Sequence, residues 1–412
     1  MTGTCAAFAS VRLAGNCTNR QRGSVAWRQD RSPRTMGRKR LRSAWFSLFS
    51  SFAAAGAIGA TLPGDIPLET PRGFVPVSIT PIKAGAYCIS GEVVAEAGSA
   101  TALAMLVDTN KRQVVWRSTI PPAESFVTNE ARSCAGSGSS YYVVTEESTS
   151  TAVTPSQSVL FIHKLDADGK LVRRQRIDAG FDEWSYLLDV SAERISVVGG
   201  DSDSPDRSGT YSTFMAQFDS DLAQTNLVKL PTGAFAPSSV ARFDGRYLRV
   251  AGPFRPNGPA PTPAACCGYA VSKIDLAKRR YIWSAHPDEP GVESPIAAFG
   301  ADGSTHYLAL DSGKLTAASV DASGRVTNRF SVSKPVCSVE AMDVAGNAFE
   351  IVGAACDEPP ASVMLSVDFS GQVVSLTRSA GDIVLIAHFD RLGWAAVVDA
   401  GDVGDVFRRM GE

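Results

Sequence analysis

A short segment recurs along most of this chain, and its recurrence constrains the fold more than any other sequence feature. Each copy has alternating apolar residues that lead into an aspartate, then a tight turn, then a second alternating run. The copies are ALAMLVDTNKRQVVW, LFIHKLDADGKLVRR, TFMAQFDSDLAQTNL, YAVSKIDLAKRRYIW, LTAASVDASGRVTNR and VMLSVDFSGQVVSLT. Such periodicity predicts a fold built from near-equivalent units.

Further strand-like runs precede each copy, for example YYVVTEE and YLRVAGP. Each unit therefore reads as four short antiparallel strands, A to D, with turn residues between them. Helical periodicity is almost absent. Units of about 50 residues made of short strands favour the blades of a β-propeller over a sandwich.

The repeats predict an all-β, seven-bladed β-propeller. Six full units occupy residues 76–382, and a seventh begins at 383–389 and 393–399 but ends after one more strand, 404–410. Residues 64–72 resemble the missing fourth strand. We therefore expect this N-terminal strand to complete the last blade and to cover two exposed sheet edges at once.

These units resemble the bacterial delta-60 or SBBP class of β-propeller repeats, which alternate apolar strands with D-x-D-G turns such as DADG in the second copy. The resemblance covers most of residues 76–400 and implies a fold and an export habit, but no activity. Quinoprotein dehydrogenase propellers are similar in size, but their tryptophan blade ending is matched only loosely, at 114–116 and 281–283. Sialidase-like boxes differ in spacing from SVDASGRVT at 319–327.

The N-terminal region differs from the rest of the chain. Residues 36–60 combine a basic run, an apolar stretch and small residues before possible cuts at Ala57 or Ala60, which is typical of a secretory signal peptide. An uncleaved membrane anchor is the alternative. Residues 1–35 are predicted to be a disordered leader or an upstream mis-start, and residues 61–412 the single propeller domain. The expected location is the periplasm or the cell exterior.

Charge excludes one class of partner. Of the 40 Lys and Arg and 42 Asp and Glu, residues 1–60 hold 10 and 1, which leaves 30 basic and 41 acidic residues in the remainder. That excess of acidic groups argues against nucleic acid as a partner. We expect a monomer with no stable membrane span after signal cleavage.

The cysteine pattern is consistent with export, because six of the eight cysteines follow residue 60. Cys337 and Cys356 flank a predicted hairpin whose turn lies midway between them, so they are expected to form a disulfide. Cys88 and Cys134 lie in neighbouring units and are a second expected pair. Cys266 and Cys267 are adjacent, and whether they pair with each other stays open.

Most residues capable of chemistry have a structural explanation. The repeated aspartates, Asp108, Asp166, Asp219, Asp275, Asp321 and Asp368, precede tight turns, where a carboxylate accepts backbone N–H bonds. The carboxylates of DSDSPDRSG (201–209) are expected to form a solvated acidic loop, with calcium binding as the alternative. His163, His306 and His388 fall within strands, and no metal motif is present. The sequence therefore predicts neither a metal site nor a cofactor.

Loop length points to a binding face. The B–C connections of the second, third and fourth units, at 145–157, 201–211 and 253–267, are long, whereas the A–B and C–D turns are short. Two neighbouring D–A connections, FDEWSY and AHPDEPG, reach the same face. The candidate ligand-binding residues are Trp184, Tyr186, Asp182, Glu183, Asp201, Asp203, Arg207 and His286. The alternative for Trp184 is that it packs between blades.

Two functions remain from the sequence. The first is a non-enzymatic binding or scaffolding propeller that uses the loop face of blades 2–4 for a protein or glycan partner, since long loops on a rigid scaffold commonly bind. The second is an exported hydrolase, lyase or quinoprotein-type dehydrogenase with a site at the channel mouth. No catalytic residue is assigned, because no recognised catalytic motif appears.

Overall fold

The structure is a computed structural model of the chain. It describes residues 64–95, 98–149, 157–191, 194–204, 210–257, 268–287, 293–300, 302–311, 314–333, 336–356, 362–379, 382–389, 393–400 and 404–410. The expected leader, the expected signal peptide and the pair Cys266 and Cys267 lie outside these residues. The described residues contain no helix, and hence no helix with the length and apolar character to cross a membrane.

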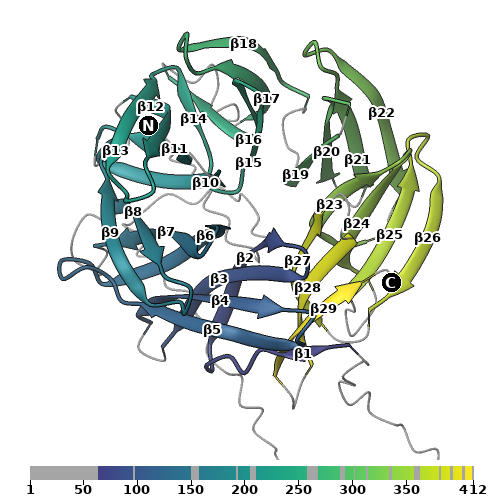
Figure 1. Cartoon of the computed structure of the whole chain (residues 1–412). Coiled ribbons are helices and arrows are strands. Elements are labelled where there is room, and N and C mark those ends of the chain that lie inside the picture. The colour runs from purple at the N-terminus through teal and green to yellow at the C-terminus, as the bar shows by residue number, and fades with distance from the viewer. Residues whose placement is uncertain are drawn as a thin grey trace, which may run out of the picture. The chain divides into compact units, whose positions relative to one another are not determined.

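Seven separate antiparallel sheets follow one another along the chain, and Figure 1 shows them arranged in a ring. The fold is the predicted seven-bladed β-propeller. Blade 1 consists of β2 (Phe74–Lys83), β3 (Ala86–Val94), β4 (Ala100–Asp108) and β5 (Gln113–Ile120). Blade 2 consists of β6 (Thr128–Ser137), β7 (Ser140–Ser148), β8 (Ser158–Leu165) and β9 (Leu171–Ile177). Blade 3 consists of β10 (Asp182–Val190), β11 (Ile195–Ser202), β12 (Tyr211–Phe218) and β13 (Gln224–Leu230).

The chain continues around the ring in the same way. Blade 4 has β14 (Gly233–Phe235), β15 (Val240–Asp244), β16 (Tyr247–Pro256), β17 (Gly268–Asp275) and β18 (Arg280–Ala285); blade 5 has β19 (Glu293–Phe299), β20 (Thr305–Asp311), β21 (Lys314–Val320) and β22 (Val326–Ser333); blade 6 has β23 (Ser338–Ala345), β24 (Ala348–Ala354), β25 (Ser362–Asp368) and β26 (Val373–Arg378); blade 7 has β27 (Asp382–Phe389), β28 (Gly393–Asp399), β29 (Asp405–Met410) and β1 (Ile66–Pro67).

The repeated aspartates hold the C–D turns, as predicted. In blade 2, Oδ1 of Asp166 accepts the N–H groups of Asp168 and Lys170, both at 2.9 Å. The same bonds recur at Asp219, Asp321 and Asp368. Three residues after each of these four aspartates the backbone has a positive φ, and the residues there are Gly169, Leu222, Gly324 and Gly371.

An apolar cluster lies at each junction between neighbouring blades, with a second, smaller one between blades 3 and 4. Clusters join blades 1 and 2, 2 and 3, 3 and 4, 4 and 5, 5 and 6, 6 and 7, and 7 and 1. The last of these packs Ile66 and Phe407 of blade 7 against Ile79 and Tyr87 of blade 1. Burial between sheets is therefore continuous around the ring and contributes most of the stabilisation.

The N-terminal strand completes blade 7, as predicted. Ile66 pairs with Phe407 in the antiparallel ladder of β1 and β29, and Leu68 N–H donates to the carbonyl of Asp405 at 3.0 Å. The guanidinium of Arg408 binds Asp65 through two hydrogen bonds of 2.8 Å, and both side chains are buried. The pairing offsets the cost of burying two charges, so it supports a very short closing strand.

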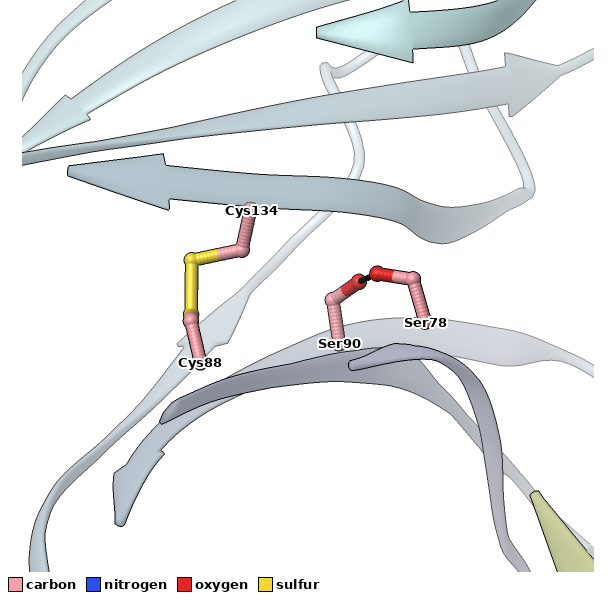
Figure 2. Close-up of a disulfide and its surroundings, with 4 residues drawn as sticks. All are labelled: Ser78, Cys88, Ser90 and Cys134. Atoms are coloured by element: carbon pink, nitrogen blue, oxygen red, sulfur yellow. Dashed lines mark hydrogen bonds between the residues drawn. A yellow bond between two sulfur atoms is a disulfide. The ribbon is translucent and has the colours of Figure 1, made fainter. Parts of the chain in front are cut away.

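Both expected disulfides are present. Cys88 on β3 is bonded to Cys134 on β6, so this bridge joins blades 1 and 2, as Figure 2 shows. Cys337 is bonded to Cys356 at the open end of the β23–β24 hairpin. A bulge between Val339 and Ala341 shifts the register of that hairpin by one residue. The two cysteines therefore meet just beyond the ladder and not within it.

The inner strands depart from regular antiparallel pairing in two ways. Each inner strand except that of blade 4 has a register shift of the kind made by a β-bulge, which bends a strand and increases its twist. In blade 4 the inner strand is instead divided into β14 and β15. Pro237 lies in the gap, where a proline ring has no N–H for the ladder, and Ser239 N–H closes a turn onto Ala236.

Candidate functional site

Several predicted site residues meet at one end of blade 3. In the ladder of β10 and β11, Asp182 lies opposite Ser202, Glu183 opposite Asp201, and Trp184 opposite Gly200. Residues directly opposite each other project from the same face of a sheet. The structure therefore brings the carboxylates of Glu183 and Asp201 to one face.

Glu183 is fully buried and engaged with backbone donors. Its Oε2 accepts Leu160 N–H of blade 2 at 3.0 Å, and its Oε1 accepts the N–H groups of Ala179 and Gly180. Burial raises the pKa of Glu183 to about 7, against the opposing effect of these hydrogen bonds. The side chain thus links blade 3 to blade 2 and to the connection between them.

Asn129 occupies the equivalent position in blade 2 and makes an equivalent link to blade 1. Asn129 is the second residue of β6, as Glu183 is of β10. Its Oδ1 accepts the N–H of Ala102, the third residue of β4, as Glu183 accepts that of the third residue of β8. Its Nδ2 donates to the carbonyl of Ile120. A polar side chain here joins an inner strand to the preceding blade.

Asp201 lies in strand β11 and is fully buried, which corrects the expectation that it belongs to a solvated loop. β11 extends to Ser202, so the connection begins only after this carboxylate. Oδ2 of Asp201 binds Nζ of Lys229 at 2.7 Å, and Lys229 also donates to the carbonyl of Ala179. Burial raises the pKa of Asp201 to about 6, while Lys229 opposes that rise.

The aromatic candidates pack between blades 3 and 4. The indole N–H of Trp184 donates to the carbonyl of Phe235 at 2.6 Å, and its ring belongs to a cluster with Tyr211 and Ala234. The hydroxyl of Tyr186 donates to the carbonyl of Gly199 at 3.0 Å. Burial raises the pKa of Tyr186. These rings fix the junction that supports the loop face.

The remaining candidates lie nearer to solvent. Asp203 is exposed, and its Oδ1 accepts Thr210 N–H at 2.6 Å. His286 is exposed at the end of blade 4. Asp182 is buried and accepts Ser158 N–H at 3.0 Å. Arg207 lies outside the described residues.

Three residues that the sequence did not single out join the connections of blades 3 and 4. The amide of Asn257 accepts Tyr211 N–H at 2.7 Å and donates to the carbonyls of Tyr211 and Pro231, both at 2.8 Å. The guanidinium of Arg255 lies 4.2 Å from the ring centre of Tyr211. The sequence Pro-Asn-Gly at 256–258, a combination typical of turns, is the sequence signal at this place.

Two of the strand histidines are buried and hydrogen-bonded. The Nε2 atom of His163 lies 2.8 Å from the hydroxyl of Thr145. Burial lowers the pKa of His163 to about 3. His388 lies in β27, and its side chain is outside the described part. No group of three potential metal ligands occurs among the described residues.

His306 is held between two serines, and its hydrogen bonds show what this cluster does. Ser304 donates its hydroxyl proton to Asp302 at 2.5 Å and therefore accepts from Nε2 of His306 at 2.8 Å. Nδ1 then accepts from the hydroxyl of Ser319 at 2.9 Å. Because the proton of Ser304 points to Asp302, His306 is not placed to withdraw it. The cluster stabilises the A–B turn of blade 5.

The B–C connections of four blades have the same hydrogen-bonded stem. The residue after strand B donates its N–H to the carbonyl of the residue before strand C, in the pairs Ala95 and Ser99, Thr149 and Gln157, Asp203 and Thr210, and Ala400 and Gly404. The stem thus encloses three residues in blades 1 and 7, and 150–156 and 204–209 in blades 2 and 3. Blades 2 and 3 therefore carry insertions on a stem that closes without them.

Comparisons with known proteins concern the fold alone. No protein family model matches the chain, and no curated protein matches it. Pyrococcus horikoshii acylaminoacyl peptidase is similar in structure at 8% identity, over 82% of this chain and 52% of that chain, with a TM-score of 0.44. The β-propeller domain of the trilobed protease from Pyrococcus furiosus is similar at 9% identity, over 73% and 96%, with a TM-score of 0.38.

A mutant of Synechocystis apocarotenoid oxygenase is also similar in structure, at 12% identity over 74% of this chain and 61% of that chain, with a TM-score of 0.38. The chain thus spans about half the length of the peptidase and less than two thirds of the oxygenase.

Proposed function

We propose that this protein is an exported, non-enzymatic binding propeller whose B–C connections in blades 2–4 hold a protein or glycan partner. The observation that carries the proposal is the shared stem, because blades 1 and 7 close the same stem with three enclosed residues. The added residues in blades 2 and 3 are not needed to connect the strands. Surface insertions on a rigid scaffold commonly carry binding.

The surroundings of the stems support the same face. Asn257 and Arg255 tie the start of the blade 4 connection to Tyr211 at the end of the blade 3 connection. Holding these connections together before a ligand arrives lowers the entropy that binding must overcome. The exposed Asp203 and the partly exposed Lys229 add opposite charges at this end of blade 3.

The buried state of the acidic candidates also favours binding over catalysis. Both carboxylate oxygens of Glu183 accept hydrogen bonds from backbone N–H groups, and Asp201 is buried and paired with Lys229. A catalytic acid or base has to reach the proton that it transfers. Raised pKa values at these two groups follow from burial within a blade junction.

A graft tests the proposal. Residues 150–156 and 204–209 are replaced by residues 96–98 of blade 1, with all stem residues kept, and the wild-type and grafted proteins are compared on glycan arrays and extracellular protein arrays. Binding by the wild type that the graft abolishes supports the proposal. Turnover of glycosidase or quinone-dependent dehydrogenase substrates, lost on changing Asp182, Glu183 or His286, would contradict it.

Export is a separate part of the proposal. Two disulfides and the lack of a membrane-spanning helix in the described residues are compatible with a periplasmic or extracellular location. N-terminal sequencing of protein from the cell envelope is expected to begin near Ile58 or Thr61. A terminus at Met1 would contradict cleavage.

A further inference from the structure

The outer strands of blades 1–6 carry basic side chains and no acidic ones. The D strands β5, β9, β13, β18, β22 and β26 contain basic residues and no aspartate or glutamate. The excess of acidic residues after residue 60 therefore lies elsewhere. β9 of blade 2 is the extreme case, with the sequence LVRRQRI directly after Lys170.

β9 also presents an open edge. Among the described strands it pairs with β8 alone, so one row of its backbone N–H and C=O groups has no strand beside it. Leu171 is 45% exposed and Val172 is 59% exposed, and Arg173 and Arg176 are exposed as well. An exposed edge of this kind is a template for another strand.

The three arginines on β9 differ in their contacts with the rest of the fold. Arg174 donates to the carbonyl of Pro121 and to His163. Arg173 and Arg176, in contrast, form no side-chain hydrogen bond or ion pair within the described residues. Arg173 lies directly opposite Lys164, a like-charge pair that disfavours the sheet. Lys164 is compensated by Asp221 at 3.1 Å, whereas Arg173 is not.

We infer that β9 is a docking edge for an extended acidic segment of another protein, which adds to blade 2 as an outer strand. Arg173 and Arg176 project from opposite faces because side chains alternate along a strand, so an added strand meets a cation on each face. Backbone pairing supplies affinity, and the arginines select acidic side chains. The inference does not rest on the proposed function of the loop face.

Blade 6 argues against a purely protective role for these charges. Charged side chains on edge strands block unwanted pairing. All six residues of β26 are exposed, including Val374 at 64% and Leu376 at 50%, yet its single charge, Arg378, stands at the end. Since the molecule leaves that apolar edge almost uncharged, protection alone does not account for the charge on β9.

The test uses the purified chain and short fluorescein-labelled peptides in fluorescence anisotropy at low ionic strength. The first peptide is built of glutamate, valine and threonine, the second is the same peptide with alternate backbone amides N-methylated, and the third has lysine for glutamate. We expect the first alone to bind. The Arg173→Ser, Arg176→Ser double variant should bind it roughly tenfold more weakly, as expected for two exposed ion pairs.

Arg280→Ser is the matched control, because Arg280 is an exposed arginine on the D strand of blade 4; it should bind as the wild type does. The Arg173→Glu, Arg176→Glu variant should instead bind the lysine peptide. Failure of the acidic peptide to bind, or equal binding of its N-methylated form, would overturn the inference; the latter would indicate attraction of any polyanion without strand pairing.

Discussion

The junction between blades 1 and 2 and the junction between blades 2 and 3 use different chemistry at the same positions. The first has the disulfide of Cys88 and Cys134. Cys88 is the third residue of β3, and Cys134 lies five residues after Asn129. The equivalent residues of the second junction are Tyr142, third in β7, and Leu188, five residues after Glu183, and both belong to one apolar cluster. A covalent bridge and an apolar contact thus occupy equivalent places.

The turn positions differ in a complementary way. In the first junction the ring of Trp116 covers Gly169, where an added Cβ would lie 2.6 Å from the ring. In the second, Arg173 stands on β9 in place of a tryptophan, and the turn position holds Leu222, which is fully buried despite its φ of +60°. An aromatic ring over glycine and a buried leucine therefore fill the same space from opposite sides.

Position in the blade, more than residue type, is thus repeated around the ring. Asn129 and Glu183 accept equivalent N–H groups, although one is a neutral amide and the other an ionisable carboxyl. The function of a polar residue in such a molecule follows from its place in the blade. Substitutions at matched positions show whether the two junctions are equivalent in energy as well as in geometry.

Removal of the first junction's disulfide has the largest expected effect. The Cys88→Ala, Cys134→Ala variant should lose about 4 kcal/mol of unfolding free energy, because the bridge restrains an unfolded segment with a sequence separation of 46. Urea unfolding measures the loss. The Cys337→Ala, Cys356→Ala control, with a separation of 19, should lose about 3 kcal/mol. An unchanged midpoint for the first variant would contradict its role in this junction.

Gly169→Ala should cost about 3 kcal/mol, since it combines a positive φ of +78° with a collision against Trp116. Gly138→Ala is the matched control: its φ is +63° and no atom lies within 4 Å of the added Cβ. That control should cost about 1 kcal/mol. Equal losses in thermal or urea unfolding would show that the ring of Trp116 does not constrain the turn.

The second junction should be sensitive to pH. The pKa of Glu183 is raised from 4.5 to about 7 by burial. The stability that depends on the protonated Glu183 carboxyl is therefore fully present below about pH 4.5 and is lost as the pH rises through about 7, a change of about 3 kcal/mol. Asp201, whose pKa is raised to about 6, changes in the same direction.

The Glu183→Gln variant isolates this contribution. Its free energy of unfolding should fall less steeply between pH 4.5 and 7 than that of the wild type, because glutamine does not titrate. Asn129→Ala, in the first junction, should keep the wild-type slope. Identical slopes for the wild type and Glu183→Gln would show that the carboxyl is not perturbed by its site.

The sequence predicted the blades well because their determinants are local. Each repeated aspartate lies within four residues of the N–H groups that it accepts, and the strand pattern has a period of two. The closing strand was predictable from counting, since blade 7 lacked one strand. Its Asp65–Arg408 ion pair was not predictable, because the partners are 343 residues apart in sequence.

The candidate site was harder to predict for the same reason. The fragment FDEWSY combines carboxylates and aromatic rings, a composition that suits a binding site, yet burial of Glu183 and Trp184 depends on contacts with the neighbouring blades 2 and 4. Asp201 was expected in a loop because strand β11 continues through polar residues. Asn257 lies in a Pro-Asn-Gly sequence that signals a turn, but nothing local indicates that its amide binds Tyr211, 46 residues away in sequence.

The role of the insertions is tested most directly by the unfolding free energy of the chain in which residues 150–156 and 204–209 are replaced by residues 96–98 of blade 1. The shared stems predict a value within about 1 kcal/mol of the wild type, because changes in surface loop length alter the closure entropy only slightly. A loss of more than about 3 kcal/mol, comparable to that for breaking a blade junction, would contradict the claim that these insertions serve binding and not the fold.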